Sequence, residues 1–439
     1  MAVEHNLYWI WLAEACGVAS KSFVRLIDRF SDPFEIYSLD EEQIEHIEGI
    51  GERLKTRLCD KQLEGAYSVI RACKSSKIDI ITYGDKRYPS RLKKLEDAPA
   101  VLFCKGKFPD FDSRLCIGIV GTRKMSEYGK ESAYKIAYEM AASNVVVVSG
   151  MALGIDSVAA CGALAAGGTT VAVLGCGVDV VYPKQHAALY ERIAKHGAVI
   201  SEFMPSSSPD KYNFPIRNRI ISGLCQGTLV VEGDRHSGAL ITARSALMQG
   251  RDVFALPGKI NESNSEGPNE LIRDGANVAL GAEDILSSYD FLYGDVINYK
   301  GLRKAQRKSA LDESVIDELG VCARSYKVSP VNEAAHVEYG QKEKGNTTSH
   351  TADSESTEKA RQTATEEIKS EAAPRDDSAL DGLDAGVRKI FEEMPIDTAV
   401  SPDMLVGEGA DVSDVITALT FLELCGLVSS LPGGLYIRK

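Results

Sequence analysis

The 439-residue sequence lacks several patterns that assign proteins to common functional classes. Its ten cysteines form no Cys-x-x-Cys pair, and no group of Cys and His has the spacing of metal ligands. Scattered cysteines of this kind are typical of buried thiols in a reduced compartment. We therefore expect a cytoplasmic protein that holds no metal and no other cofactor.

Patterns for membrane insertion and for catalysis are also missing. No apolar run reaches the length of a membrane span, and charge near the start (Glu4) argues against a signal peptide. The sequence contains no Walker-type phosphate loop and no Ser, His and Asp at a spacing that would single them out as a catalytic set. We expect a protein that makes no contact with membranes and is not an enzyme.

Positive charge is scarce overall, since 50 Lys and Arg face 63 Asp and Glu and leave a net charge of −13. Such a chain does not favour nonspecific binding of DNA, so a nucleic-acid site would have to be a local basic patch. The apolar content of 44% is ordinary for a globular protein. By length, two to three domains are expected.

Residues 1–75 have the apolar spacing of helices and predict a helical domain of the SAM or helix–hairpin–helix kind. Residues 44–58 contain two helical segments around the turn Gly49-Ile50-Gly51. Two interpretations of this turn stay open. Its amides can bind a DNA phosphate, or it is a plain helical hairpin. Glu45, Glu48 and Glu52 bring negative charge close to the turn, which weighs against the first.

A connector is predicted at 76–111, with short strands around 78–83 and 100–104, and an α/β core at 112–297. The core alternates helical segments with short, β-branched, almost continuously apolar runs, which are typical of strands covered on both faces. This alternation predicts an extended Rossmann-like, doubly wound parallel sheet. The strand candidates are residues 115–120, 145–149, 170–174, 198–201, 228–232 and 252–255.

The apolar pattern is lost at 298–379, which is predicted to be a disordered linker because it has few large apolar residues. Residues 380–439 predict a winged helix, with helices at 385–394, 404–406 and 412–424 and a hairpin of 427–430 with 435–438. From Asp381 onward this domain carries ten acidic and four basic residues. A winged helix that reads DNA needs the opposite charge, so a protein-contact or regulatory role is expected.

Glycine and small hydroxyl residues follow several predicted strands, where backbone amides and a helix dipole can hold a phosphate. Gly121, Thr122 and Arg123 follow the first core strand, and Ser126 stands at a helix N-cap position. Lys184, Gly238 and Thr242 follow later strands. Because the carboxyl ends of parallel strands share one edge of the sheet, this series suits a nucleic-acid backbone better than a single nucleotide.

The strongest candidate site is the segment 211–219. Lys211, Arg217, Asn218 and Arg219 supply donors that can form charge-assisted contacts with phosphate. Phe214 offers a face on which an unpaired base can stack. The alternative is a helix with Phe214 in the core and one arginine paired to a glutamate, either Glu202 or Glu232.

The motifs together resemble one family. They include Gly121-Thr122-Arg123 with Ser126-x-Tyr128-Gly129, and Ser149-Gly150-x-Ala152-x-Gly154-Ile155-Asp156. The block Phe214-Pro215-x-Arg217-Asn218-Arg219 and the later Ser237-Gly238-Ala239-Leu240-Ile241-Thr242-Ala243 are the most specific. The chain resembles the DprA/Smf family of DNA-processing proteins, outside the predicted linker. It departs from the family pattern at Ala160, where family members usually carry a histidine.

The resemblance implies a protein of natural transformation and competence that binds and protects incoming single-stranded DNA and loads the RecA recombinase onto it. RecA and a second copy of the chain are the protein partners it implies. By position, Arg123, Lys184, Lys211 and Arg217 would hold phosphates, and Phe214 would meet a base. The alternative is a phosphoribohydrolase on the same Rossmann-like core. It is disfavoured because residues 232–242 lack the Pro-Gly-Gly-x-Gly-Thr-x-x-Glu loop of those enzymes.

Overall fold

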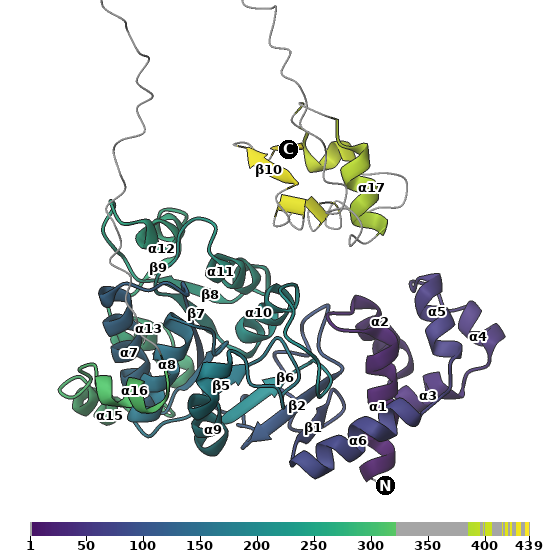
Figure 1. Ribbon diagram of the computed structural model, residues 1–439, viewed down its shortest axis with the longest axis horizontal. Coiled ribbons are helices and arrows are strands. Elements are labelled where there is room, and N and C mark those ends of the chain that lie inside the picture. Colours follow the sequence, from purple (N-terminus) through teal and green to yellow (C-terminus); the bar gives the residue numbers. More distant parts are fainter. Residues whose placement is uncertain are drawn as a thin grey trace, which may run out of the picture. The chain divides into compact units, whose positions relative to one another are not determined.

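The computed structural model describes residues 2–321 and parts of 385–438. The chain divides into two units, Met1–Tyr339 and Gly340–Lys439 (Figure 1). The first unit contains the N-terminal helices and a nine-stranded sheet, and the second contains a small two-stranded sheet.

Six helices precede the first strand. They are α1 (Ala2–Cys16), α2 (Lys21–Phe30), α3 (Pro33–Ser38), α4 (Glu41–Glu45), α5 (Glu52–Cys59) and α6 (Glu64–Ser76). Their ends follow from the sequence, since Asp32 caps α3 with Pro33 in its first turn and Asp40 forms a capping box with Gln43 on α4. The Gly49-Ile50-Gly51 turn joins α4 to α5, and Ile50 is buried in the helical core. A phosphate contact at this turn stays a prediction.

The sheet contains all six strands predicted for the core and three more. The strands are β1 (Asp79–Thr82), β2 (Val101–Gly106), β3 (Cys116–Val120), β4 (Val146–Ser149), β5 (Thr170–Val173), β6 (Ala198–Ser201), β7 (Gly227–Val230), β8 (Asp252–Ala255) and β9 (Asn277–Val278). Their order is β1-β2-β6-β5-β4-β3-β7-β8-β9. The chain moves outward from β3 in one direction through β6, then crosses to β7 on the other side, as in doubly wound folds.

The predicted doubly wound parallel sheet is confirmed for β3 to β9, and residues 76–111, predicted as a connector, extend it at one edge. β1 pairs with β2 and β2 pairs with β6, both antiparallel, so residues 76–111 contribute two strands to the sheet. The strands had been located approximately from their apolar residues. Their direction follows from pairing with β6, about a hundred residues further along the chain, which local sequence does not specify.

Helices cover both faces of the sheet (Figure 1). α7 (Glu127–Ala142), α8 (Ile155–Ala165) and α9 (Ala187–His196) cover one face. α10 (Asn213–Leu224) and α11 (Gly238–Met248) lie on the other. A short 3-10 helix, η1 (Lys184–His186), precedes α9. α12 (Ser263–Arg273) packs against β8, α13 (Ala282–Ser287) packs against α7, and α14 (Asp290–Tyr293) follows α13 in the chain. Two buried clusters fill the space between the layers.

The predicted disordered linker begins too early, because residues 298–321 are ordered. They contain α15 (Tyr299–Ala305) and α16 (Glu313–Glu318), which pack against α7 and α8. Leu302 and Ile316 are buried in the core, and the 3 % exposed Lys130 of α7 pairs with Glu313. The charged composition of the segment hid its few inward-facing apolar residues. Residues 322–379 of the predicted linker lie outside the described residues.

In the second unit, α17 (Ala385–Glu393) agrees with the first helix predicted for the winged helix. A 3-10 helix, η3 (Pro402–Leu405), overlaps the second. The predicted hairpin is confirmed by the antiparallel pair β10 (Val428–Leu431) and β11 (Leu435–Arg438). Most of the third predicted helix, 412–424, lies outside the described residues.

Replacing Ile316 by alanine tests whether the segment 298–321 is part of the fold. Ile316 is fully buried, and truncating such a side chain typically removes about 2–5 kcal/mol of stability. We expect Ile316→Ala to lower the melting temperature measured by differential scanning calorimetry. The neighbouring Asp317 is exposed, so Asp317→Ala is the matched control and should melt like the parent. Equal melting of the two variants would mean that the segment adds no stability.

Candidate nucleic-acid interface

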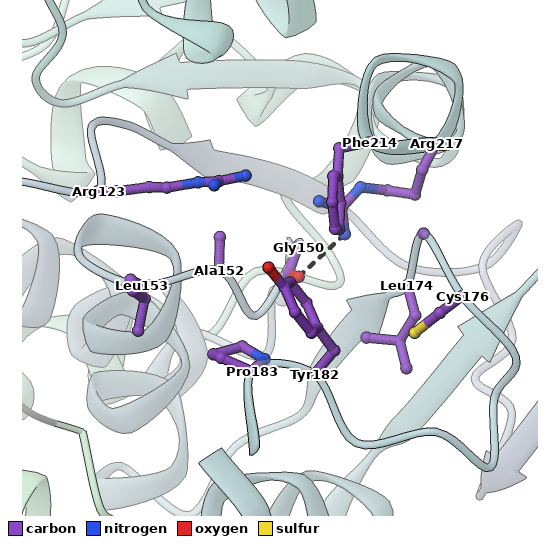
Figure 2. A pocket seen from close by; sticks show the side chains of 11 residues that line it. Arg123, Gly150, Ala152, Leu153, Leu174, Cys176, Tyr182, Pro183, Phe214 and Arg217 are labelled. Carbon is purple, nitrogen blue, oxygen red and sulfur yellow. Dashed lines mark hydrogen bonds between the residues drawn. The ribbon is translucent and has the colours of Figure 1, made fainter. Parts of the chain in front are cut away.

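A small cavity of about 40 Å³ opens where β3, β4 and β5 end. Figure 2 shows Arg123, Phe214 and Arg217 along one side of the cavity, with Leu153, Tyr182 and Pro183 along the other. The lining residues are Arg123, Gly150, Ala152, Leu153, Leu174, Gly175, Cys176, Tyr182, Pro183, Phe214 and Arg217. The cavity is too small to enclose a nucleobase, but it can receive part of a charged group.

Glycines allow the large side chains to reach the cavity. A Cβ on Gly150 would stand 2.5 Å from Nη2 of Arg217, and a Cβ on Gly175 would stand 2.9 Å from the ring of Phe214. Both separations are shorter than carbon atoms tolerate, so any other residue would displace the arginine or the ring. The glycines noticed in the sequence therefore make room for side chains. Their amides had been the expected feature.

Arg217 forms the floor of the site. Its guanidinium is 4% exposed and donates to the carbonyl oxygens of Gly150, at 2.9 Å, and of Val173. Its Nε donates to the side chain of Asn218 at 3.2 Å. Burial lowers the pKa of Arg217 to about 10, and the nearby Asp156 opposes that shift. The guanidinium still carries its positive charge at neutral pH, held in a fixed position beside the cavity.

Phe214, Tyr182 and Arg123 form a stack beside Arg217. The rings of Tyr182 and Phe214 are stacked, with centroids 5.4 Å apart and planes 28° apart. The Arg123 guanidinium lies 5.5 Å from the Phe214 centroid, and Figure 2 shows it reaching from the loop after β3 towards that ring. The Phe214 ring therefore already contacts the Tyr182 ring and the Arg123 guanidinium. Tyr182, at 37% exposed, is the more accessible ring for a base.

Arg219 does not belong to this site, contrary to the sequence prediction. Its guanidinium is buried and pairs with Glu202 at 2.5 Å and with Asp97 at 3.4 Å. Residues two apart on a helix point in different directions, so Arg217 and Arg219 leave α10 on different sides. The alternative left open by the sequence combined such a pair with Phe214 in the core. The structure contains the pair with Glu202, but Phe214 lines the cavity.

The predicted phosphate loop at Gly121 and Thr122 is already occupied by protein groups. The amide of Thr122 donates to the Glu232 carbonyl at 2.7 Å. Ser126 caps α7, and both its amide (2.9 Å) and its hydroxyl donate to the Glu232 carboxylate. The Glu232 carboxylate thus occupies the place at the start of α7 where a phosphate was expected. Burial raises the pKa of Glu232. Gly121 allows Ile155 to approach, since a Cβ there would stand 2.6 Å from it.

The remaining predicted residues surround the cavity or lie within the core. Lys184 and Lys211 are exposed, and Lys184 follows the cavity-lining Pro183 directly. The amide of Asn218 donates to the Gly238 carbonyl at 3.5 Å, which links α10 to α11. Thr242 is only 1% exposed and is not among the cavity-lining residues.

The sequence analysis did not identify Tyr182 as a site residue. The signal was an aromatic residue after the β5 strand, at the edge where ligands of such sheets bind. Asp156, the last residue of the motif that begins at Ser149, also lies beside the site. It accepts from the Gly150 amide at 3.0 Å and lies close enough to Arg217 to influence the pKa of that group.

Within the part of the chain that the structure describes, no group of three or more His, Cys, Asp or Glu could hold a metal ion. The helices described there include none that is both long and apolar enough to cross a membrane.

Comparison with known proteins gives consistent matches. Residues 79–290 match the family model of DNA recombination-mediator protein A. The chain is 40% identical over 238 residues to DNA processing protein DprA of Bacillus subtilis, covering 53% of this chain and 80% of that protein. The structure of DprA from Streptococcus pneumoniae is similar, with a TM-score of 0.57 and 34% identity, over 64% of this chain and 96% of that one.

A weaker likeness, with a TM-score of 0.44 and 30% identity, is to a structure of DNA processing protein A from Helicobacter pylori that concerns its single-stranded DNA binding mode. It covers 48% of this chain and 95% of that chain.

Replacing Arg219 by methionine should destabilise the fold, because it leaves the Glu202 carboxylate buried without its main partner. Removing one member of a buried ion pair typically lowers stability by about 3–5 kcal/mol. Burial already raises the pKa of Glu202, and Arg219 opposes this. Without Arg219 the native state binds the Glu202 proton more tightly. The loss of stability should therefore be greater at pH 8 than at pH 5.

Thermal melts of the parent and Arg219→Met at these two pH values measure this effect. Arg235→Met is the control, because Arg235 forms a partly exposed pair with Glu266 and its loss should change the melting temperature little. A melting difference that does not depend on pH would contradict the assignment to Glu202.

Proposed function

Because this chain belongs to the DprA/Smf family of DNA-processing proteins, we propose that it binds single-stranded DNA at the cavity beside Arg123 and Arg217. The observation that carries the proposal is the combination of two guanidinium groups with a stacked aromatic pair at the carboxyl edge of the sheet. The guanidinium groups fit the phosphates of a nucleotide chain, and the aromatic pair fits its bases.

The cationic half fits the phosphate backbone. Arg217 supplies a charge whose position is fixed by two carbonyl oxygens, and the exposed Arg123, which lies over the Phe214 ring, supplies a second one. Lys184 and Lys211 add exposed charge on neighbouring segments. Because the chain as a whole carries a net charge of −13, binding depends on this local concentration of positive charge and should weaken as salt rises.

The aromatic half fits an unpaired base. Stacking on an aromatic ring contributes roughly 1–3 kcal/mol per base and tolerates any base, because every base has a π-face. Tyr182 is exposed on the stacked pair, whereas the bases of a duplex are already stacked on one another. Single strands should therefore bind more tightly than duplex, without strong sequence preference.

We propose a binding protein in preference to a glycoside-cleaving enzyme on the same core. The acidic side chain nearest the end of β7 is Glu232, and its carboxylate accepts from Ser126 and, at 3.4 Å, from Asn264. A carboxylate held in this way is poorly placed to attack or to take a proton from a substrate. The matched family model also describes a recombination mediator, which supports the proposal that this protein delivers single strands to the RecA recombinase in transformation.

A homodimer is proposed through the edge of the sheet formed by β9. β9 is the last strand in the sheet order, and an unpaired edge strand offers backbone groups to another chain. Val278 is 46% exposed and Leu280 is 73% exposed, so the edge also presents apolar side chains. Two copies that meet here would bury these residues.

Variants of Arg123 and Tyr182 test the proposed site. Arg123→Gln should weaken binding of a dT30 strand about tenfold, or about 1.4 kcal/mol, and make the salt dependence shallower by about 0.7 in slope. Tyr182→Ala should weaken binding by a similar factor without changing the slope, because it removes stacking but no charge. Fluorescence anisotropy titrations at several salt concentrations provide both quantities.

Two matched variants serve as controls for these titrations. Tyr182→Phe keeps the ring and should bind nearly like the parent. Lys195→Gln removes one exposed charge near the end of α9, just before β6 begins and therefore away from the carboxyl ends of the strands. It should leave binding nearly unchanged. If Arg123→Gln binds dT30 like the parent at every salt concentration, the cavity is not the binding site.

Leu280→Glu tests the proposed dimer. It places a charge on each side of the proposed contact, and like charges brought together there should drive the copies apart. We expect the molar mass measured by light scattering to change from a dimer to a monomer, while the melting curve keeps a single transition. Ile260→Glu is the control, since Ile260 is 95% exposed and lies outside β9. An unchanged dimer mass for Leu280→Glu would place the interface elsewhere.

A further inference from the structure

Residues 300–308 form a second basic surface that is separate from the cavity. The stretch contains five basic residues and no acidic one, in a chain with a net charge of −13. Its basic residues are Lys300, Arg303, Lys304, Arg307 and Lys308, and all five are exposed. We call these five side chains the basic strip.

The basic strip is held rigidly against α7. Leu302 and Ala305, on the inner face of α15, are 2% and 4% exposed. The amide of Asn298 donates to the Ser143 carbonyl at 3.0 Å, and a Cβ on Gly301 would stand 2.2 Å from the Ala142 carbonyl oxygen. At the other end, Ser309 donates to Glu139 at 2.8 Å. The backbone beneath the five bases is therefore fixed before any ligand arrives.

The charges of the basic strip are available for a ligand. No ion pair joins any of its five side chains to an acid in the described residues. The neighbouring acids have other contacts. Glu283 accepts from Gln306 at 3.2 Å, Asp290 accepts from Tyr299 at 3.0 Å, and Glu313 pairs with Lys130. A protein with a net charge of −13 does not need five exposed basic residues in one short stretch to remain solvated.

The basic strip and the cavity lie towards opposite ends of α7. The loop that carries Arg123 leads into the start of α7, whereas α15 begins beside the last residues of α7, at Ala142 and Ser143. The 16 residues of α7 span about 24 Å at 1.5 Å per residue. A single strand of a few tens of nucleotides can reach both sites, whereas a strand of four nucleotides has three phosphates between its nucleosides, too few to contact both sites at this separation.

We propose that the basic strip is a second contact surface for the backbone of the single-stranded DNA held at the cavity. This inference rests on the proposed function, and it adds a surface where phosphates are bound without any reading of bases. A strand held at two sites gains affinity because its second contact is intramolecular. Long strands should therefore bind much more tightly than short ones, and the difference should depend on the basic strip.

The test compares two variants that lose the same charge. Arg303→Gln/Lys304→Gln/Arg307→Gln removes three charges from the basic strip, and Arg71→Gln/Lys74→Gln/Lys77→Gln removes three exposed charges at and just beyond the end of α6. Anisotropy titrations use dT30, dT4 and a 30-base-pair duplex. The strip variant should bind dT30 at least tenfold more weakly, with a salt slope shallower by about 2. Its binding of dT4 should match that of the parent. The α6 variant should match the parent on every ligand.

The proposal is overturned if the strip variant binds dT30 like the parent, if the α6 variant loses as much affinity, or if only duplex binding falls. Thermal melts check that both variants are folded, which the exposure of all six side chains leads us to expect. Arg123→Gln on dT4 separates the two proposals. If it has no effect there while the strip variant loses affinity for dT30, the cavity assignment fails and the two-site proposal fails with it, although the basic strip itself binds DNA. A parent that binds no DNA at all overturns both.

Discussion

The structure of the candidate site depends on the burial of one guanidinium. Arg217 lies beneath the carboxyl ends of β4 and β5 and donates to a carbonyl oxygen at each of them. Burying a charge is unfavourable unless it is paired and hydrogen-bonded, and here Asp156 and the carbonyl oxygens supply the partners. The glycine at position 150 leaves room for it. The result is a permanent positive charge, fixed in place, in a protein whose overall charge is negative.

Helix α10 connects this charge to the rest of the molecule. Arg217 leaves the helix towards the cavity, and Arg219 leaves it towards Glu202, whose carboxylate also accepts from the Ala19 amide at 3.1 Å. The two arginines, two positions apart in sequence, thus serve different purposes. One supplies charge to the site, and the other links the core to the loop between α1 and α2. Displacing α10 would disturb both contacts at once.

The sequence predicted the strands of the core well, because a continuous β-branched run such as 145–149 can be covered on both faces only as a strand in a two-sided sheet. It also predicted the edge of the sheet at which the cavity lies. Side-chain directions were less predictable. Ser126 and Thr122 have the composition of a phosphate loop, but Glu232 contacts both from a hundred residues away. The segment 298–321 was misassigned because its inward-facing residues, such as Leu302 and Ile316, are few and are separated by charged ones.

The distribution of charge explains how an acidic protein can be suited to a polyanion. Negative side chains spread over a surface are screened by salt beyond about 10 Å, so a strand close to the protein responds mainly to nearby groups. The nearby groups at the cavity are Arg123 and Arg217, and at α15 they are the five bases of the basic strip. The acidic remainder repels DNA from other faces. Net charge therefore limits where a strand can bind, and in the proposed mode of binding the two basic sites determine its path.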